Sequence, residues 1–151
     1  MSLSPDQSNF LDRATLAARN ATCTFPQMVA CEAALESAYG TSNLAKKYNN
    51  LFGLKTHRHN LYGSVSLPTR EFLDGEWVQT SSDFETYRDW DTCFFDRLST
   101  LIRLSGAYPH YAGALNAPDA ETYIREVSQT WSTDPNRAAN VTALYNEYAK
   151  S

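Results

Sequence analysis

Residues 26–40, PQMVACEAALESAYG, form the stretch that decides the fold. Apolar residues recur there at helical spacing, with Met28, Cys31 and Leu35 on one side, and alanines fill many of the other positions. Small side chains allow a helix to pack closely against its neighbours. A proline opens the stretch and Gly40 closes it, as is usual at the two ends of a helix. The stretch therefore predicts a central buried helix that ends at Gly40.

Two glutamates interrupt this apolar stretch. Glu32 and Glu36 are four residues apart and share a side of the predicted helix. Glu36 lies near the apolar end, where a carboxyl group that loses solvation keeps its proton more readily, as the general acid of a glycosidase must. The alternative is that both glutamates face water or pair with Lys46 or Arg19. Chemistry alone leaves the two interpretations open.

Helical patterns continue on both sides of this stretch. We expect helices at 6–20, 42–48 and 91–106, one that begins at 116–119 and a last one that begins at 134–135. A compact turn is expected at 49–55 and an exposed loop at 55–63. No repeat or low-complexity linker divides the 151 residues, a length that suits one domain. We expect a single domain over 1–151, with residues 1–5 disordered or foreign to the natural start.

The middle of the chain changes to a two-residue period. Val65, Leu67 and Glu71 fall on one face of an alternating segment, and the Asp-Gly pair at 74–75 is a strong hairpin turn. Residues 77–87 are the expected return strand. The predicted class is α+β, mainly helical, with a small β-hairpin lobe beside the helical lobe.

Most glycosidases need a second carboxylate, and Glu71 is the best candidate. It is a polar residue on an otherwise apolar strand face, which often indicates function. It can equally be an edge-strand charge that discourages aggregation. Asp74 is explained by the turn, while Glu76 and Glu85 are expected on a solvent face.

Charge and composition exclude several classes of protein. The net charge is −4 and the 13 Lys and Arg are scattered, so the basic stripe of a nucleic-acid binder is missing. No run of 18 apolar residues exists to span a membrane, and the first residues lack the charged and apolar regions of a signal peptide. Aromatic residues make up 13% of the chain, which fits a core or a carbohydrate groove.

The cysteines and histidines do not indicate a cofactor. Because there are 3 cysteines, at least one of Cys23, Cys31 and Cys93 is not in an internal disulfide. Cys31 and Cys93 lie in apolar helical patterns and are expected to be buried thiols. His57 and His59 lack a third ligand at a suitable spacing, so no metal site is expected.

Four segments, in order, resemble glycoside hydrolase family 73, the bacterial and phage N-acetylglucosaminidases related to flagellar peptidoglycan hydrolases. The segments are AALESAYG at 33–40, NNLFGLK at 49–55, YAGAL at 111–115 and TDP at 133–135. Their order and spacing agree with the family over roughly residues 10–149.

A few positions depart from the family pattern. Ala38 and Tyr39 stand where Gly and Trp are common, and Arg97 stands where a histidine is frequent. Thr-Trp-Ser at 130–132 replaces the usual Gly-Tyr-Ala. These departures affect the expected contacts with the glycan, and none removes a proposed catalytic group.

The resemblance implies a lysozyme-like fold in which the helical lobe and the hairpin lobe flank a groove. It assigns Glu36 as the general acid and places Glu71 where relatives carry a second glutamate on a mobile hairpin. Tyr111 matches a groove tyrosine that supports catalysis. Asn50 and Phe52 are expected to shape the floor of the groove.

Two further residues are weighed as substrate contacts. Trp77 on the hairpin is either a packing residue or a platform for a sugar ring. His110, which precedes the family-like segment at 111–115, is either a plain loop histidine or a substrate contact.

The sequence thus predicts a monomeric endo-β-N-acetylglucosaminidase that cleaves a β-1,4 bond of peptidoglycan glycan strands. It would act in the periplasm or outside the cell, with no cofactor, metal or nucleic-acid partner. Two alternatives remain: a muramidase or lytic transglycosylase that cuts the same glycan, and a non-catalytic module that binds the cell wall.

Overall fold

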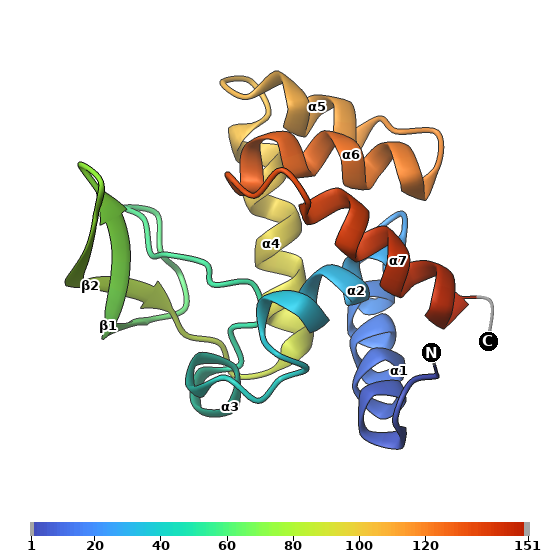
Figure 1. Ribbon diagram of the computed structural model, residues 1–151, viewed down its shortest axis with the longest axis horizontal. Helices are drawn as coiled ribbons and strands as arrows, with labels where there is room; N and C mark the ends of the chain where they lie inside the picture. Colours follow the sequence, from blue (N-terminus) through green and yellow to red (C-terminus); the bar gives the residue numbers. More distant parts are fainter. Residues whose placement is uncertain (1, 150–151) are drawn as a thin grey trace.

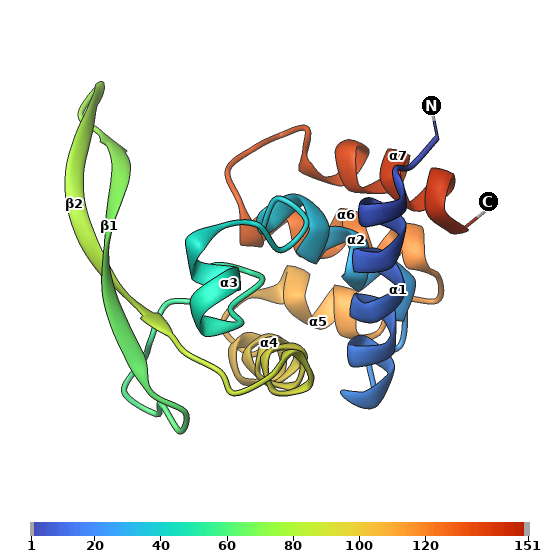
Figure 2. The same cartoon turned by 90° about the horizontal axis from the view of Figure 1, so that it is seen from below.

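The computed structural model describes residues 2–149 of the chain. Within that range seven helices form a body from which one antiparallel β-hairpin extends (Figures 1 and 2). The elements are α1 (Pro5–Asn20), α2 (Pro26–Glu36), α3 (Asn43–Tyr48), β1 (Ser64–Leu73), β2 (Glu76–Glu85), α4 (Trp90–Leu104), α5 (Pro109–Leu115), α6 (Ala120–Trp131) and α7 (Arg137–Ala149). The predicted class, α+β and mainly helical with a hairpin lobe, is confirmed.

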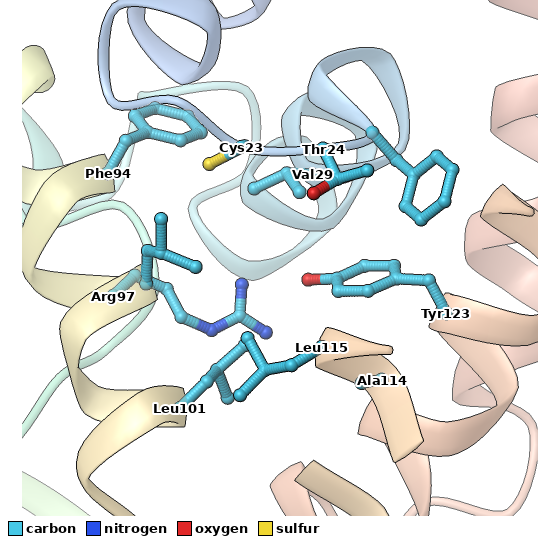
Figure 3. A pocket seen from close by; sticks show the side chains of 11 residues that line it. Cys23, Thr24, Val29, Phe94, Arg97, Leu101, Ala114, Leu115 and Tyr123 are labelled. Carbon is cyan, nitrogen blue, oxygen red and sulfur yellow. The ribbon is translucent and has the colours of Figure 1, made fainter. Parts of the chain in front are cut away.

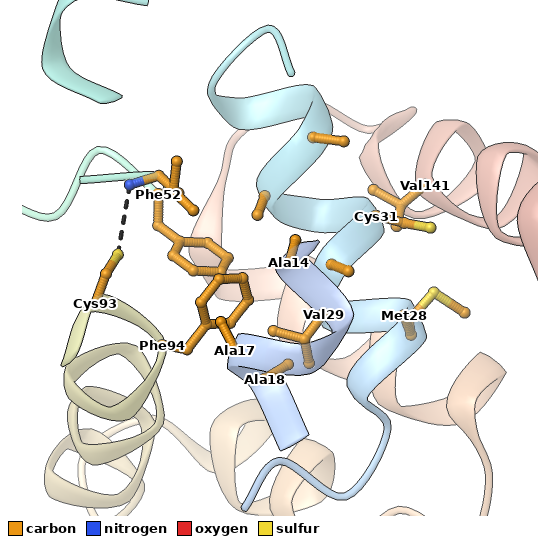
Figure 4. Packing of buried hydrophobic residues seen from close by; sticks show 14 of the residues in the cluster. Ala14, Ala17, Ala18, Met28, Val29, Cys31, Phe52, Cys93, Phe94 and Val141 are labelled. Atoms are coloured by element: carbon orange, nitrogen blue, oxygen red, sulfur yellow. Dashed lines mark hydrogen bonds between the residues drawn. The ribbon is translucent and has the colours of Figure 1, made fainter. Parts of the chain in front are cut away.

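Helix α2 lies at the centre of the helical body, as predicted. Every residue from Met28 to Ala34 is buried, because α1 packs on one side of the helix and α7 on another. Small side chains allow this close approach: Ala14, Ala17 and Ala18 of α1 face the core beside Val29 of α2 (Figure 4). The middle of α2 is thus buried on every side, and its burial is not limited to one apolar face.

The end of α2 differs from the prediction. The helix stops at Glu36, and Leu35 is 44% exposed. Three successive residues with positive φ, at 38–40, turn the chain away (φ 50°, 55° and 78°). The Ser37 hydroxyl stabilises this turn, since it donates to the Ala33 carbonyl at 2.6 Å and accepts from the Gly40 amide at 2.9 Å. Glu36 is therefore the last helical residue, at the edge of the body.

The hairpin has the predicted turn and the predicted faces. Asp74 and Gly75 both have positive φ, 51° and 83°, as a two-residue hairpin turn requires. Val65, Leu67 and Glu71 share the half-buried face of β1. The return strand covers 76–85, one residue earlier at its start than predicted and two earlier at its end.

The expectation that Glu85 faces solvent is wrong. Its side chain is 1% exposed, at the point where β2 meets the helical body. The Glu85 amide donates to the Leu54 carbonyl at 2.9 Å, and the Glu85 carbonyl accepts from the Asn50 amide group at 3.0 Å. Burial and then the nearby Asp96 raise the pKa of the Glu85 carboxyl. These contacts attach the base of the hairpin to the body.

Some helices also differ from the predictions. Helix α5 was not predicted, because seven residues are too few for a helical period to be recognised. The last helix begins at Arg137, two residues after the predicted start. At the other end Ser4 caps α1 and Pro5 begins it, so the predicted disorder does not extend to these two residues. Met1 lies outside the described residues.

The cysteines lie as predicted. Cys31 and Cys93 are buried free thiols, and burial raises the pKa of each to about 12. The Cys93 sulfur accepts a hydrogen bond from the Leu51 amide at 3.4 Å (Figure 4). Along residues 2–149, no helix combines the length and the apolar character that crossing a membrane requires.

The turn after α2 gives a test of the fold. Gly40→Ala should lower the free energy of unfolding by about 2 kcal/mol, because φ is positive there and L side chains are strained in that region. The added Cβ would also lie 3.0 Å from the ring of Phe10. Gly106→Ala is the matched control, since its Cβ would meet nothing within 4 Å. Urea denaturation measures both variants, and equal stabilities would contradict the account.

Candidate active site

A groove of about 570 Å³ lies where the hairpin joins the helical body. Such a volume suits a small chain of sugar rings. Residues from five parts of the chain line it: Glu36 at the end of α2; Phe52, Gly53, Leu54, Lys55 and His57 after α3; Asp96, Thr100, Arg103 and Leu104 on α4; Tyr111 on α5; and Trp131 and Ser132 at the end of α6. The groove therefore brings together segments that are far apart in the sequence.

Glu36 reaches the groove from the end of α2. Its side chain is 31% exposed, so the predicted loss of solvation is only partial. One oxygen, Oε1, accepts a hydrogen bond from Arg137 Nε at 3.1 Å. The partner is therefore neither Lys46 nor Arg19. An oriented carboxyl group that borders both the protein and the groove can exchange a proton with a bound molecule.

Glu32, one helical turn earlier, is fully buried and lies at the centre of an ion network. Its Oε2 accepts from Arg97 and Arg137, each at 2.7 Å, and its Oε1 accepts from the Tyr123 hydroxyl at 2.6 Å. Burial raises the pKa of Glu32, but the charges of Arg97 and Arg137 outweigh burial and lower it to about 2. The two arginines thus balance the negative charge of one buried carboxylate.

Arg97 and Tyr123 approach Glu32 from α4 and α6. Figure 3 shows the guanidinium of Arg97 and the hydroxyl of Tyr123 pointing toward one another, beside a cavity of about 40 Å³. That cavity is too small for a sugar ring. The network therefore joins helices in the interior, while the open groove has room for a larger ligand.

Aromatic rings form part of the groove wall above this network. The Arg97 guanidinium lies 4.7 Å from the ring centre of Phe52 and 4.1 Å from the ring of Trp131. Tyr111 packs against Trp131 with ring centres 6.3 Å apart. Stacking on a buried cation fixes these rings. Phe52 and Tyr111 are only 2% and 5% exposed, whereas Trp131 is half-buried, so Trp131 presents most of the ring surface that is open to the groove.

Asn50 shapes the groove without lining it. The side chain is 1% exposed and closes the turn at 49–55. Its amide group donates to the Leu54 carbonyl at 2.9 Å, and its oxygen accepts from the Phe52 and Leu54 amides at 3.3 and 3.1 Å. Asn50 thereby sets the position of Phe52 in the wall.

The other predicted site residues lie outside the groove lining. Glu71 on β1 is bound by Lys55, which does line the groove, with Nζ and Oε1 3.3 Å apart. Trp77 is 62% exposed near the hairpin tip and packs on Phe72, with ring centres 5.4 Å apart. His110 lies 2.7 Å from Glu126 on the surface. The groove thus unites Glu36, Phe52 and Tyr111 of the predicted set.

Three parts of the site were not found from sequence: Arg137, Trp131 as a groove residue, and the role of Glu32. An acidic residue within a run of apolar ones was the available signal, because a buried carboxylate needs a cationic partner. The two partners are 65 and 105 residues away along the chain, so the sequence does not identify them.

Comparison with known proteins finds a matching family model and relatives that carry the names of cell-wall hydrolases. The glucosaminidase family model, described as mannosyl-glycoprotein endo-beta-N-acetylglucosaminidase, matches residues 13–150. The chain is 32% identical over 130 residues to the probable N-acetylmuramidase of Lactococcus lactis, covering 82% of this chain and 29% of that protein. It is 31% identical over 121 residues to the peptidoglycan hydrolase FlgJ of Vibrio parahaemolyticus, covering 77% and 38% respectively. The chain thus spans less than half of the length of these relatives.

Solved structures of cell-wall hydrolases also resemble this chain. The catalytic domain of the autolysin Auto from Listeria monocytogenes superposes with a TM-score of 0.83 at 25% identity, covering 99% of this chain and 88% of that one. A C-terminally truncated glycoside hydrolase domain of FlgJ from Salmonella typhimurium gives a TM-score of 0.74 at 25% identity, covering 96% and 99%. The lysozyme-like fold predicted from the sequence is confirmed.

The buried network predicts how stability responds to pH. The folded pKa of Glu32 is about 2, below its ordinary value of 4.5, so its contribution is full above about pH 4.5 and is lost as pH falls toward 2. We expect this contribution to be about 3 kcal/mol. Glu32→Gln should remove this part of the acid dependence and cost about 3–5 kcal/mol at pH 7, since two buried arginines lose their counter-charge.

Urea denaturation between pH 2 and 7 measures both effects. Glu76→Gln, at an exposed position on the hairpin, is the control and should change stability by less than about 0.5 kcal/mol. A Glu32→Gln protein with the stability and acid dependence of the wild type would contradict the network's role.

Proposed function

Since the chain belongs to the glucosaminidase family, we propose that it hydrolyses peptidoglycan as an endo-β-N-acetylglucosaminidase that cleaves a β-1,4 bond of the wall glycan. The observation that carries the proposal is the position of Glu36, whose carboxyl group borders a groove with aromatic walls. The proposed site of action is the bacterial wall, in the periplasm or outside the cell, and the protein acts as a monomer.

Glu36 is the proposed general acid. Its proton passes to the glycosidic oxygen as the bond from that oxygen to the sugar carbon breaks, and positive charge grows on the sugar ring. A glycan in the groove displaces water from a side chain that is 31% exposed before binding.

Glu71 is the proposed second carboxylate, and Lys55 connects it to the groove. The ion pair at 3.3 Å places Glu71 beside a residue that borders the glycan path. From the hairpin Glu71 either activates a water molecule or stabilises the charge on the ring. A third route uses the substrate's own N-acetyl group as the nucleophile. Tyr111 is proposed to support catalysis from the groove wall.

Sugar contacts are assigned to Trp77 on the hairpin and to the small exposed part of Phe52 that borders the groove. Trp77 exposes 62% of its surface, and Arg70 lies over its ring at 5.3 Å, so the ring is held while one side stays accessible. Asn50 contributes by fixing the turn that carries Phe52. His110 is proposed as a peripheral contact, since its ring is bound to Glu126.

A different cut of the same glycan is the second candidate. The relative from Lactococcus lactis carries the name of a muramidase, although the family description is that of a glucosaminidase. A muramidase or lytic transglycosylase would use the same acid on the neighbouring bond. The products distinguish these reactions, and their absence would indicate a wall-binding module.

Replacement of the acid tests the proposed chemistry. Glu36→Gln should reduce release of wall fragments by about 100- to 10,000-fold, because an amide is far too weak an acid to transfer a proton to the leaving oxygen. Circular dichroism should show an unchanged fold. Glu121→Gln, on the exposed face of α6, is the matched control and should retain full activity. Full activity in Glu36→Gln would end the proposal.

Product analysis identifies the bond. Mass spectrometry of digested peptidoglycan, after borohydride reduction, should show N-acetylglucosamine at the new reducing ends. N-acetylmuramic acid there would assign a muramidase, and an anhydro sugar would assign a lytic transglycosylase. Binding without fragments would leave only the wall-binding module.

A further inference from the structure

Arg137 joins the buried network to the proposed general acid. It is the first residue of α7 and its side chain is 6% exposed. Its three guanidinium nitrogens have different partners: Nε donates to Glu36 at 3.1 Å, Nη2 to Glu32 at 2.7 Å and Nη1 to the Ser128 hydroxyl at 2.9 Å. With every nitrogen engaged, the guanidinium has one orientation.

The partners of Arg137 are themselves fixed. Glu32 is fully buried and is also bound by Arg97 and Tyr123, so it cannot follow a movement of Arg137. Rotation of Arg137 would leave a buried carboxylate with one fewer counter-charge, which is costly. Because Arg137 is fixed to the core, its contact with Glu36 also fixes the position of the Glu36 carboxyl group.

We propose, resting on the proposed function, that Arg137 is the positioning residue of Glu36. It holds Oε1, which leaves Oε2 to carry the proton toward the glycosidic oxygen. When that proton leaves, the electron pair of the broken O–H bond stays on Glu36 as negative charge, and Arg137 is the cation beside it. The same contact therefore orients the acid and stabilises its conjugate base.

Other charged groups of the groove do not serve this purpose. Lys55, Asp96 and Arg103 also line it, but in the part of the chain that the structure describes only Arg137 lies within ion-pair distance of Glu36. Lys55 is bound to Glu71. Loss of Arg137 would thus leave Glu36 with no cation to orient it.

Steady-state kinetics on soluble glycan strands test the proposal. Arg137→Gln should lower kcat by about 100-fold and leave KM within about 3-fold, because a misplaced acid slows the chemical step and leaves the sugar-binding wall in place. Arg137→Lys should recover kcat to within about 10-fold of the wild type, since the charge remains. Arg125→Gln is the control: Arg125 is exposed on α6 and donates to the Thr122 hydroxyl, so kcat and KM should stay within about 2-fold.

A milder substitution tests the same proposal if the Arg137→Gln protein does not fold. Ser128→Ala removes one of the three contacts that hold Arg137 and adds no bulk. It should lower kcat several-fold, with KM unchanged. A folded Arg137→Gln protein with kcat within about 3-fold of the wild type would overturn the proposal. If that variant does not fold, an unchanged kcat in Ser128→Ala would overturn it.

Crystal structures of Arg137→Gln and Arg125→Gln give a readout that does not depend on activity. In Arg137→Gln the Glu36 carboxyl group should move by at least about 1 Å or occupy several conformers, and in Arg125→Gln it should stay in place. A Glu36 carboxyl group that remains where it is without Arg137 would refute positioning. If the wild type releases no fragments, the proposed function fails, and these structures still decide whether Arg137 orients Glu36.

Discussion

One buried carboxylate, that of Glu32, is the constraint on which the structure depends. An ionised group without contact with water is tolerated only when it is paired and hydrogen-bonded, and Arg97, Arg137 and Tyr123 supply these bonds. They come from α4, α7 and α6, while Glu32 belongs to α2. A single ion cluster therefore fixes four helices relative to one another. Apolar packing brings these helices together, and the cluster adds directional ion pairs and a hydrogen bond between them.

The site follows from where this cluster meets the surface. Helix α2 ends one turn after Glu32, where three residues in the left-handed region redirect the chain, and its last residue is Glu36. The same arginines that neutralise Glu32 support the site: Arg97 carries the rings of Phe52 and Trp131, and Arg137 holds Glu36. The proposed site thus lies at the edge of the core, where the groove is open to a glycan.

The sequence predicts those features of the structure that depend on local residue patterns. The apolar run at 26–36 predicted the central helix, and the Asp-Gly pair predicted the hairpin with Glu71 on its half-buried face. The resemblance of four short segments placed Glu36 and Phe52 in the groove. The parts that failed depend on distant contacts: the arginine partners of Glu32, and the burial of Glu85 where the hairpin meets the turn at 49–55. A charge pattern along one chain does not reveal which residue lies opposite a carboxylate 105 positions away.

The central claim is that a glycan lies in the groove with a glycosidic oxygen beside the side chain at position 36. A crystal structure of Glu36→Gln in complex with a peptidoglycan tetrasaccharide measures this directly. The account predicts sugar rings along Phe52, Tyr111 and Trp131, with one glycosidic oxygen within about 3.2 Å of the Gln side chain. A glycan bound elsewhere, such as in the depression of about 680 Å³ between α6 and α7, with the groove free of sugar, would contradict it.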